Sequence, residues 1–204
     1  KVLVTGGAGY IGSHTVLALL ESGKDVVAVD NFSNSSPESL KRVAQIAGRT
    51  PDVVEADISD NGKLGEIFSG NPDISSVIHF AALKAVGEST QHPLKYYHNN
   101  VTGSVILLDA MQRAGVKNLV FSSSCTVYGE PEKVPISESF PVGSVSSPYG
   151  RTKYMMEEII EDYAKSDPAF CCAVLRYFNP VGAHSSGEIG EDPNGIPDNL
   201  VPFV

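Results

Sequence analysis

The stretch TGGAGYIG, residues 5–12, constrains the fold of this chain more than any other feature. It lies between a short apolar run and a segment with helical spacing of apolar residues. Gly7, Gly9 and Gly12 fit the pattern G-x-G-x-x-G, and Gly6, Gly9 and Gly12 also fit the wider pattern G-x-x-G-x-x-G. Such glycines form a tight turn, let backbone amides approach a pyrophosphate and let the helix pack close to the strand. The loop therefore predicts a dinucleotide-binding unit, although glycines can also serve a turn alone.

Short β-branched runs recur along the chain and alternate with helical patterns. We expect strands at 2–5, 25–30, 52–57, 76–81, 118–124 and 172–178, and helices including 11–23 and 99–114. Their apolar composition predicts buried parallel strands. The alternation predicts an α/β fold, a Rossmann-like doubly wound parallel sheet with right-handed crossovers.

A change in composition near residue 178 predicts a domain boundary. We assign residues 1–178 to the NAD-binding Rossmann-like domain, and the Gly- and Pro-rich residues 179–204 to the beginning of a smaller substrate-binding region. The chain starts without Met and stops in the apolar run NLVPFV. We therefore expect the smaller region to continue beyond Val204.

Acidic residues at two expected strand ends indicate the kind of dinucleotide. Asp30 lies near the distance of about 20 residues at which the glycine motif places an acid for the adenosine ribose. A carboxylate there repels a 2′-phosphate, so the sequence favours NAD over NADP. Asp57, followed by Ile58, could contribute to an adenine site, or Asp57 could simply cap the end of its strand.

Tyr149 and Lys153 lie four residues apart near the start of an expected helix. Ser147 can cap this helix, and Pro148 suits its first position. Residues at i and i+4 share a helix face, so we expect the ammonium to lower the pKa of the phenol from about 10 and to make it a general base. A Y-x-x-x-K spacing alone usually marks an exposed pair. Beside a dinucleotide loop and the strand-end serine Ser124, it predicts catalysis.

Charge and composition exclude several classes of function. The formal net charge of −9 disfavours nucleic acid and anionic membrane surfaces as partners. No apolar run approaches the roughly 18 residues of a membrane span. Neither the three cysteines nor the five histidines have a metal-ligand spacing. We therefore expect plain thiols in a reducing compartment, no metal site and a cytoplasmic protein.

Several motifs together resemble a known family. TGGAGYIG, SSS and YGRTK are similar to the extended short-chain dehydrogenase/reductase family. HFAALKAVGES, YYHNNV, LRYFNPVGAH and GEDPNGIPDNL extend the similarity from Val2 to Leu200 and resemble its sugar-nucleotide epimerases. The resemblance implies a homodimer that uses NAD to invert C4 of a UDP-hexose, interconverting UDP-glucose and UDP-galactose. The sugar would be oxidised to a 4-keto form and reduced from its other face.

The resemblance also implies roles for individual residues. Ser124, Tyr149 and Lys153 would be catalytic, with the phenolate of Tyr149 taking the proton of the sugar 4-hydroxyl. NAD would be held by Gly6, Gly7, Gly9, Tyr10, Ile11, Gly12, Asp30, Asn31, Asp57, Ile58, Phe80, Ala81, Ala82, Lys84, Asn99, Ser122, Tyr149, Lys153 and Tyr177. The sugar nucleotide would contact Lys84, Ser124, Tyr149, Phe178, Asn179, Asn199 and Leu200.

Two alternatives remain beside an epimerase. Related dehydratases of the family carry an acid/base pair directly after the strand-end serine, whereas Cys125 and Thr126 follow Ser124 here and the nearest carboxylate is Glu130. Another sugar-nucleotide reductase or dehydratase is thus the second choice. A non-catalytic NAD-binding protein is the third, and it would be expected to lack the tyrosine or the lysine. We expect arginines beyond Val204 to clamp the UDP pyrophosphate.

Overall fold

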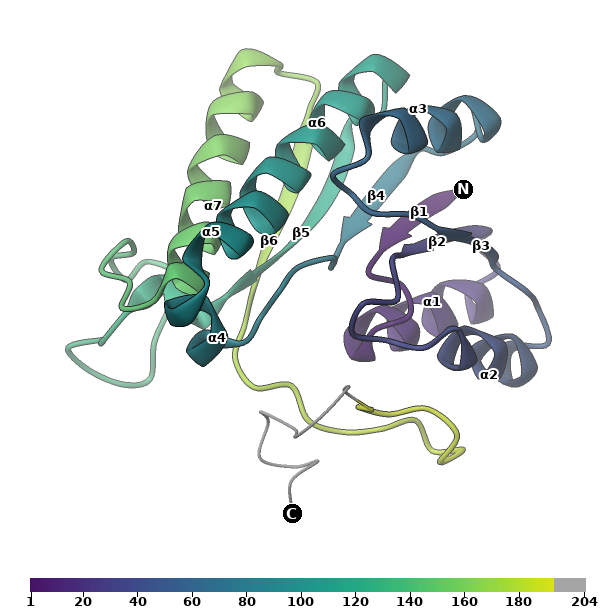
Figure 1. Ribbon diagram of the computed structural model, residues 1–204, viewed down its shortest axis with the longest axis horizontal. Helices are drawn as coiled ribbons and strands as arrows, with labels where there is room; N and C mark the ends of the chain where they lie inside the picture. The colour runs from purple at the N-terminus through teal and green to yellow at the C-terminus, as the bar shows by residue number, and fades with distance from the viewer. Residues whose placement is uncertain (193–204) are drawn as a thin grey trace.

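In the computed structural model, which describes residues 1–192, six parallel strands form one sheet in the order β3-β2-β1-β4-β5-β6 (Figure 1). The strands are β1 (Val2–Thr5), β2 (Val26–Asp30), β3 (Asp52–Glu55), β4 (Ser76–His79), β5 (Asn118–Ser124) and β6 (Cys171–Tyr177). All six predicted strands are present, with ends shifted by at most two residues. The strand order reverses direction between β1 and β4, which is where a doubly wound sheet opens a ligand crevice.

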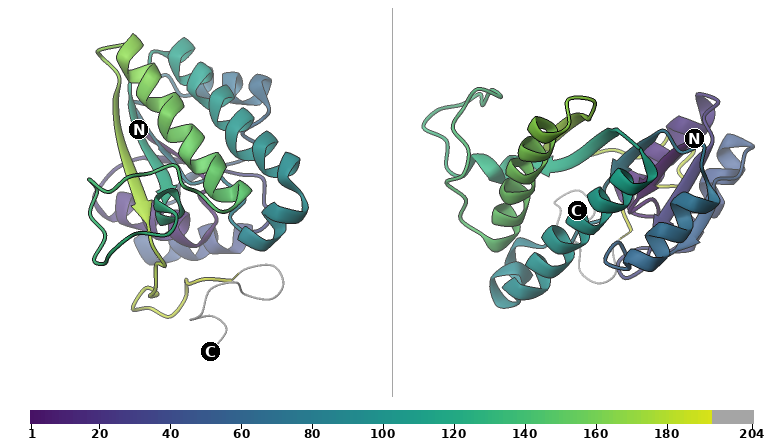
Figure 2. Two further views of the ribbon diagram at one scale, coloured as in Figure 1. Left: turned by 90° about the vertical axis from the view of Figure 1, so that its left-hand side faces the viewer. Right: turned by 90° about the horizontal axis from the view of Figure 1, so that it is seen from above.

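Helices cover both faces of the sheet, as predicted for a doubly wound fold (Figure 2). The helical elements are α1 (Tyr10–Glu21), α2 (Pro37–Ala47), α3 (Asn61–Gly70), α4 (Val86–Gln91), α5 (Pro93–Tyr96), a π-helical turn η1 (Tyr97–Thr102), α6 (Gly103–Ala114), a 3₁₀ turn η2 (Cys125–Tyr128) and α7 (Pro148–Ser166). Helices α1 and α2 pack on one face, and α3, α6 and α7 pack on the other.

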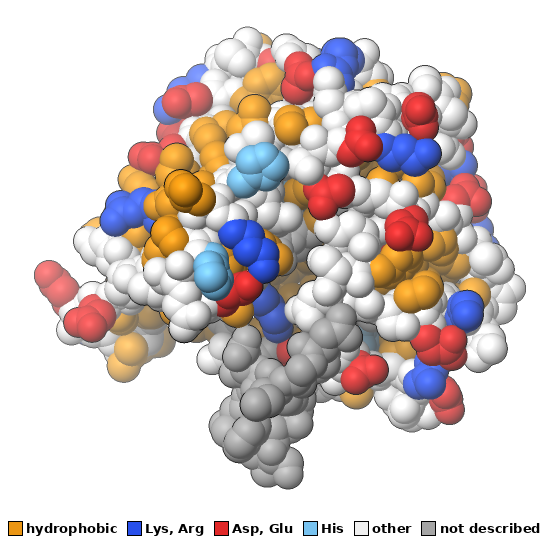
Figure 3. All heavy atoms as spheres, in the orientation of Figure 1, with side chains coloured by type: hydrophobic (Ala, Val, Ile, Leu, Met, Phe, Trp, Pro, Cys, Tyr) orange, Lys and Arg blue, Asp and Glu red, His pale blue; other side chains and the backbone are white. Residues whose placement is uncertain are grey.

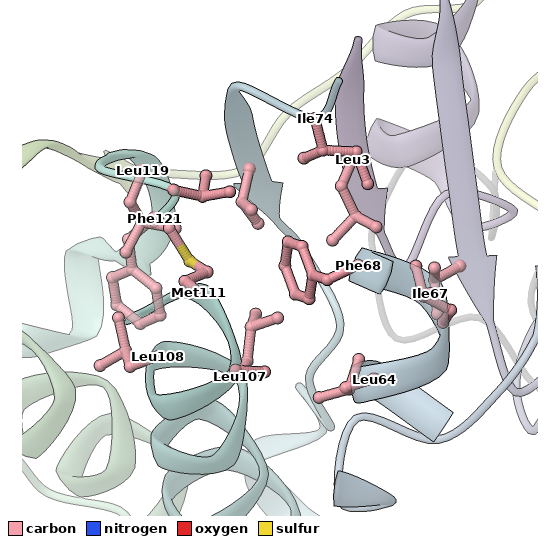
Figure 4. Packing of buried hydrophobic residues seen from close by; sticks show 14 of the residues in the cluster. Leu3, Leu64, Ile67, Phe68, Ile74, Leu107, Leu108, Met111, Leu119 and Phe121 are labelled. Atoms are coloured by element: carbon pink, nitrogen blue, oxygen red, sulfur yellow. The ribbon is translucent and has the colours of Figure 1, made fainter. Parts of the chain in front are cut away.

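The core has two layers because successive strand residues point to opposite faces. Leu3 belongs to the cluster under α3, α6 and α7, and its neighbour Val4 belongs to the cluster under α1 and α2. Figure 4 shows Phe68 of α3 pointing toward Leu3, and Met111 of α6 lying beside Phe121. This packing fixes the helices relative to the carboxyl ends of the strands.

The prediction that every strand is buried is wrong for the two edge strands. Val53 of β3 is 45% exposed, and Val174 and Leu175 of β6 are 37% and 41% exposed. Within residues 1–192, each edge strand pairs with one neighbour, β3 with β2 and β6 with β5. A β-branched run predicts a strand, but its place in the sheet depends on topology.

The segment that follows β6, residues 180–192, runs beneath the strand ends toward α1 and α2 (Figure 1). Ile189 is buried in the cluster of α1 and α2. The guanidinium of Arg42 donates a hydrogen bond to the carbonyl of Glu188 at 3.0 Å, and the Tyr10 hydroxyl donates to the carbonyl of Gly182. We call residues 180–192 the crossing segment.

Candidate dinucleotide and catalytic site

A cleft of about 1420 Å³ lies at the carboxyl ends of the strands. Figure 3 shows the surface hollowed between the two halves of the molecule, with Lys or Arg side chains beside the hollow. Small-molecule pockets typically measure about 300–1,000 Å³, so this cleft has room for a dinucleotide. Of the predicted site residues that the structure describes, Gly7 is the one that does not line it. Asn199 and Leu200 lie outside the described residues.

The glycine loop combines a tight turn with close packing. Gly6 has φ +66°, and a Cβ there would lie 2.7 Å from the amide nitrogen of Ala81. A Cβ on Gly12 would lie 2.0 Å from the carbonyl oxygen of Gly6. Gly7 packs instead against Ala28: a Cβ added to Gly7 would lie 2.9 Å from the Cβ of Ala28. Only glycine therefore allows this approach of α1 to the loop.

The first turn of α1 fits an anion. Gly9 is its N-cap, and no side chain of the described residues caps the helix there. The amides of the first helical turn have no partner within their own helix. Because this helix end also carries partial positive charge and lines the cleft, it suits the pyrophosphate of a dinucleotide.

Asp30 ends β2 beside the glycine loop and is only 8% exposed. Its Oδ2 accepts from the amide of Ala8 at 2.9 Å, and its Oδ1 accepts from the amide of Phe32 at 2.9 Å and from the Ser35 hydroxyl at 2.8 Å. A carboxylate has about four acceptor sites, so one remains for a ribose hydroxyl. Phe32 has φ +52°, which is uncommon outside glycine.

Asn31 and Asp57 are joined across the ends of β2 and β3. The amide nitrogen of the Asn31 side chain donates to Asp57 Oδ2 at 2.7 Å, while the amide and hydroxyl of Ser59 donate to Oδ1 at 2.8 and 2.6 Å. Burial opposes ionisation of Asp57, but these hydrogen bonds outweigh it and hold the pKa below its ordinary value. Asp57 thus also caps the end of its strand, which was the second role that the sequence allowed for it.

Tyr149 and Ser124 meet at the end of β5. Ser147 caps α7 by accepting from the amide of Gly150 at 3.1 Å, so the predicted start of the helix is confirmed. The phenol and the Ser124 side chain both line the cleft, close enough for Ser124 to act on the pKa of the phenol. The Ser124 hydroxyl also accepts from the hydroxyl of Thr126 at 3.0 Å. The strand end and the helix start therefore bring these two side chains together at the cleft.

The expected effect of Lys153 on Tyr149 is wrong in this structure. Burial raises the pKa of the Tyr149 phenol, and the hydrogen bond from Ser124 acts in the opposite direction. The amine of Lys153 instead donates to the carbonyl of Ser122 at 2.7 Å and lies 5.1 Å from the centre of the Phe121 ring. Lys153 is 4% exposed, and burial lowers its pKa to about 8.

A chain of hydrogen bonds that the sequence analysis did not identify runs behind the cleft. The Ser104 hydroxyl donates to the carbonyl of Asn100 at 2.6 Å, so it accepts from Nε2 of His79 at 2.8 Å. His79 Nδ1 then accepts from the hydroxyl of Thr5 at 2.6 Å, and Thr5 accepts from the amide of Ala81 at 3.4 Å. The chain ties the loop after β4 to β1 and η1.

Asn100 extends this connection to α7, the helix that carries Tyr149. Its side chain accepts from the amide of Leu83 at 2.9 Å and donates to the carbonyl of the same residue at 2.9 Å. It also donates to the hydroxyl of Thr152, which donates to the carbonyl of Tyr149 at 2.7 Å. Asn99, the neighbour predicted from the resemblance, lines the cleft.

The remaining predicted residues lie around the mouth of the cleft. Phe178 is 57% exposed, and Asn179 follows it. The amine of Lys84 forms an ion pair with Glu191 of the crossing segment at 3.0 Å. Tyr177 is half-buried, and burial raises the pKa of its phenol.

Two further observations concern metals and membranes. No group of three or more His, Cys, Asp or Glu side chains within residues 1–192 could hold a metal ion. In the same part of the chain, no helix combines the length and apolar character needed to cross a membrane.

The chain is similar to several curated proteins and solved structures. It is 61% identical over 203 residues to a UDP-glucose 4-epimerase of Pasteurella multocida, covering 100% of this chain and 60% of that protein, and 55% identical over 210 residues to one of Mus musculus, with the same coverage. The solved UDP-glucose 4-epimerase of Bifidobacterium longum with NAD⁺ and UDP aligns with a TM-score of 0.97 and 50% identity, covering 99% of this chain and 60% of that one.

These comparisons bear on the family of the chain. The similarity to sugar-nucleotide epimerases predicted from the motifs is confirmed. The chain spans about 60% of the length of the curated relatives it matches. The family model described as "NAD dependent epimerase/dehydratase family" matches residues 2–202, and the chain therefore belongs to the NAD-dependent epimerase/dehydratase family.

Proposed function

We propose that this chain is the NAD-binding part of an enzyme that interconverts UDP-glucose and UDP-galactose by inverting C4 of the sugar. The observation that carries the proposal is the convergence of Tyr149, Ser124 and Lys153 on the dinucleotide cleft, with Lys153 buried one turn further along the same helix as Tyr149. The names of the relatives, UDP-glucose 4-epimerase at 55–61% identity, support the substrate.

The cleft supports NAD as the cofactor. The glycine loop and the uncapped start of α1 suit its pyrophosphate, and Asp30 suits the adenosine ribose and disfavours a 2′-phosphate. Asn31, Asp57 and Ile58 would surround the adenosine, and the loop 80–84 with Asn99 would line the other half of the cleft. When bound, NAD supplies the acceptor and then the donor of a hydride.

The chain itself would supply proton transfer and alignment. Tyr149 would take the proton of the sugar 4-hydroxyl, and Ser124 would hold the same oxygen by a hydrogen bond. Because burial raises the pKa of Tyr149, its phenolate needs stabilisation. Ser124 contributes to it in this structure. The buried amine of Lys153, which donates to the Ser122 carbonyl, would instead bind the nicotinamide ribose. Return of the proton to the 4-keto sugar would complete a redox-neutral cycle.

We also propose roles that concern the substrate and the assembly. Lys84, Phe178 and Asn179 would contact the sugar nucleotide, together with Asn199 and Leu200. Residues 1–178 would form the cofactor domain, with the substrate region beginning at residue 179. The complete protein would be a cytoplasmic homodimer. Exposed apolar side chains on the α4–α6 side, including Val105 at 41%, support an interface there.

An NMR assay tests the reaction. The full-length gene product, incubated with NAD and UDP-galactose but no added reductant, should produce the anomeric signal of UDP-glucose. Formation of a 4-keto-6-deoxy sugar would instead indicate a dehydratase. Binding of NAD without any turnover of UDP-hexoses would support a non-catalytic protein.

Replacement of Tyr149 by Phe tests the proposed base. The variant removes one hydroxyl and keeps the ring, so it should bind NAD as the wild type does while kcat falls by about 100-fold or more. Fluorescence titration with NAD and the NMR assay measure the two properties. Turnover close to that of the wild type would show that Tyr149 is not the base.

A further inference from the structure

Behind the proposed site lies a partly buried polar cluster that the proposed chemistry does not use. The carboxylate of Glu157 accepts from Arg176 Nη2 at 2.7 Å and from Nε at 3.1 and 3.2 Å. It also accepts from the hydroxyl of Ser123, which is 2% exposed. Arg176 Nη1 donates to the Tyr128 hydroxyl at 2.9 Å, and the guanidinium lies 4.9 Å from the centre of that ring. The cluster therefore joins β5, η2, α7 and β6.

Two members of the cluster are adjacent to catalytic groups of β5 and α7. Ser123 lies between Ser122, whose carbonyl accepts from Lys153, and Ser124, whose side chain meets the phenol. Glu157 follows Lys153 by one helical turn on α7, so both side chains lie on the same helix face. Arg176 in turn immediately precedes the cleft residue Tyr177 on β6. A shift of Glu157 would thus move both strand ends relative to α7.

The charge of Glu157 also acts on Lys153. Burial lowers the pKa of Lys153 to about 8, and Glu157 opposes that effect. The other titratable groups that face Lys153 or share its helix face are His79 of β4, whose pKa burial lowers to about 3, and the Tyr149 phenol, whose pKa is raised. Both of these are neutral at pH 7, so neither offsets the positive charge of Lys153.

Resting on the proposed function, we propose that Glu157 is a positioning residue of this site. With Arg176 and Ser123 it fixes the ends of β5 and β6 against α7. It also supplies the negative charge that stabilises the protonated form of the buried Lys153 amine. The Arg176 guanidinium donates to both oxygens of the carboxylate and thereby orients them. A merely structural ion pair would affect stability but not the protonation of Lys153.

Substitution Glu157→Gln in the full-length gene product separates these roles. The amide keeps the length of the side chain and removes its charge, so Lys153 should lose its proton about one pH unit lower. The basic limb of the pH profile of kcat/KM should move to lower pH by the same amount. Compared with the wild type, kcat/KM of Glu157→Gln should be about tenfold lower near pH 8.5. Near pH 6.5, where Lys153 keeps its proton in both proteins, it should be less than about twofold lower.

Glu158→Gln is the matched control. Glu158 is the next residue on α7, it is exposed and it contacts the Tyr154 hydroxyl at 2.8 Å, so the same loss of charge there should leave the limb unmoved. Glu157→Asp keeps the charge with a shorter side chain and should lower kcat without moving the limb. If Glu157→Gln does not fold, a shifted limb in Glu157→Asp would overturn the proposal.

A titration that does not depend on turnover completes the test. In protein labelled with ¹³C-lysine, the Cε signal of Lys153, assigned by its loss in Lys153→Arg, should titrate about one unit lower in Glu157→Gln than in the wild type. An unchanged midpoint would overturn the inference about Glu157. A shifted midpoint in a protein that does not epimerise UDP-hexoses would retain the electrostatic role and reject the proposed function.

Discussion

His79 is a buried imidazole with hydrogen bonds at both ring nitrogens, and it is 3% exposed. With the ring neutral and its proton on Nε2, His79 donates to Ser104 and accepts from the hydroxyl of Thr5. Burial lowers the pKa of His79 to about 3, in agreement with this arrangement. The residue therefore orders the loop after β4 without carrying charge.

Protonation of His79 in acid should lower the free energy of unfolding. Its pKa is lower in the folded than in the unfolded protein, where it is about 6.5, so this contribution to stability is complete above pH 6.5. It is lost as the pH falls toward 3, by up to about 1.4 kcal/mol per unit. Urea unfolding at several pH values should show that, below pH 6.5, the free energy of unfolding falls more steeply with pH for the wild type than for His79→Gln.

Gly12 should not tolerate even a methyl group. In Gly12→Ala the new Cβ would lie 2.0 Å from the Gly6 carbonyl, so α1 or the loop must move. We expect a loss of about 1–3 kcal/mol in the free energy of unfolding and a weakened affinity for NAD. Gly65→Ala in α3 meets no atom within 4 Å and should instead stabilise the protein by about 0.5–1 kcal/mol. Thermal unfolding and NAD titration compare the two variants, and equal effects would contradict the packing argument.

Residue types and spacings predicted the glycine loop, Asp30, Tyr149 and Lys153 as neighbours of one cleft. They did not predict the direction of the pKa shift of Tyr149, because burial is set by the whole fold rather than by the i, i+4 spacing. Glu157 and His79 were missed because nothing in a single sequence distinguishes them from ordinary helical and strand residues.

At the scale of the elements, the π-helical turn η1 is the main departure from the predicted helix over 99–114. The apolar periodicity of that segment indicates a helix but not an inserted residue. The insertion accompanies two adjacent asparagines, Asn99 lining the cleft and Asn100 buried against Leu83 and Thr152. These contacts are long-range, so local propensity could not reveal them. π-helical turns are frequent at functional sites.

Asn100→Ala tests how far η1 holds the neighbouring loop. The change leaves the amide and carbonyl of Leu83 without their partner and removes the link to Thr152. We expect a loss of about 2–4 kcal/mol in the free energy of unfolding, because each buried unpaired group costs about 1–3 kcal/mol. Hydrogen exchange should become faster at Leu83. Unchanged protection of that amide would show that the loop is held by other contacts.

At the scale of the whole molecule, the alternation of strands and helices predicted the sheet and its two helical layers. It did not predict that the crossing segment returns to α1 and α2. Gly and Pro residues mark that segment as irregular, but its position depends on the docking of Ile189 and on the contacts of Arg42 and Tyr10. Its route places it beside the cleft mouth, where Lys84 meets Glu191.

Ile189→Asp should release the crossing segment while leaving the sheet folded. A carboxylate in an apolar cluster is costly, so the segment should undock rather than bury the charge. Limited proteolysis should then cut within residues 180–192 faster than in the wild type, and NAD should dissociate faster. Val181→Asp, at a site that is already 69% exposed, is the control. Equal cleavage rates for the wild type and Ile189→Asp would contradict the docking.

The exposed edge formed by β6 has a practical consequence for laboratory work with this chain. Val174 and Leu175 are exposed, and among the described residues, 1–192, no strand pairs with the outer edge of β6, a combination that invites strands of other molecules to add to the sheet. A purified sample should remain monodisperse when dilute and scatter more light as it is concentrated. A lysine introduced at position 175 should delay that onset, which makes it a sensible first change before crystallisation.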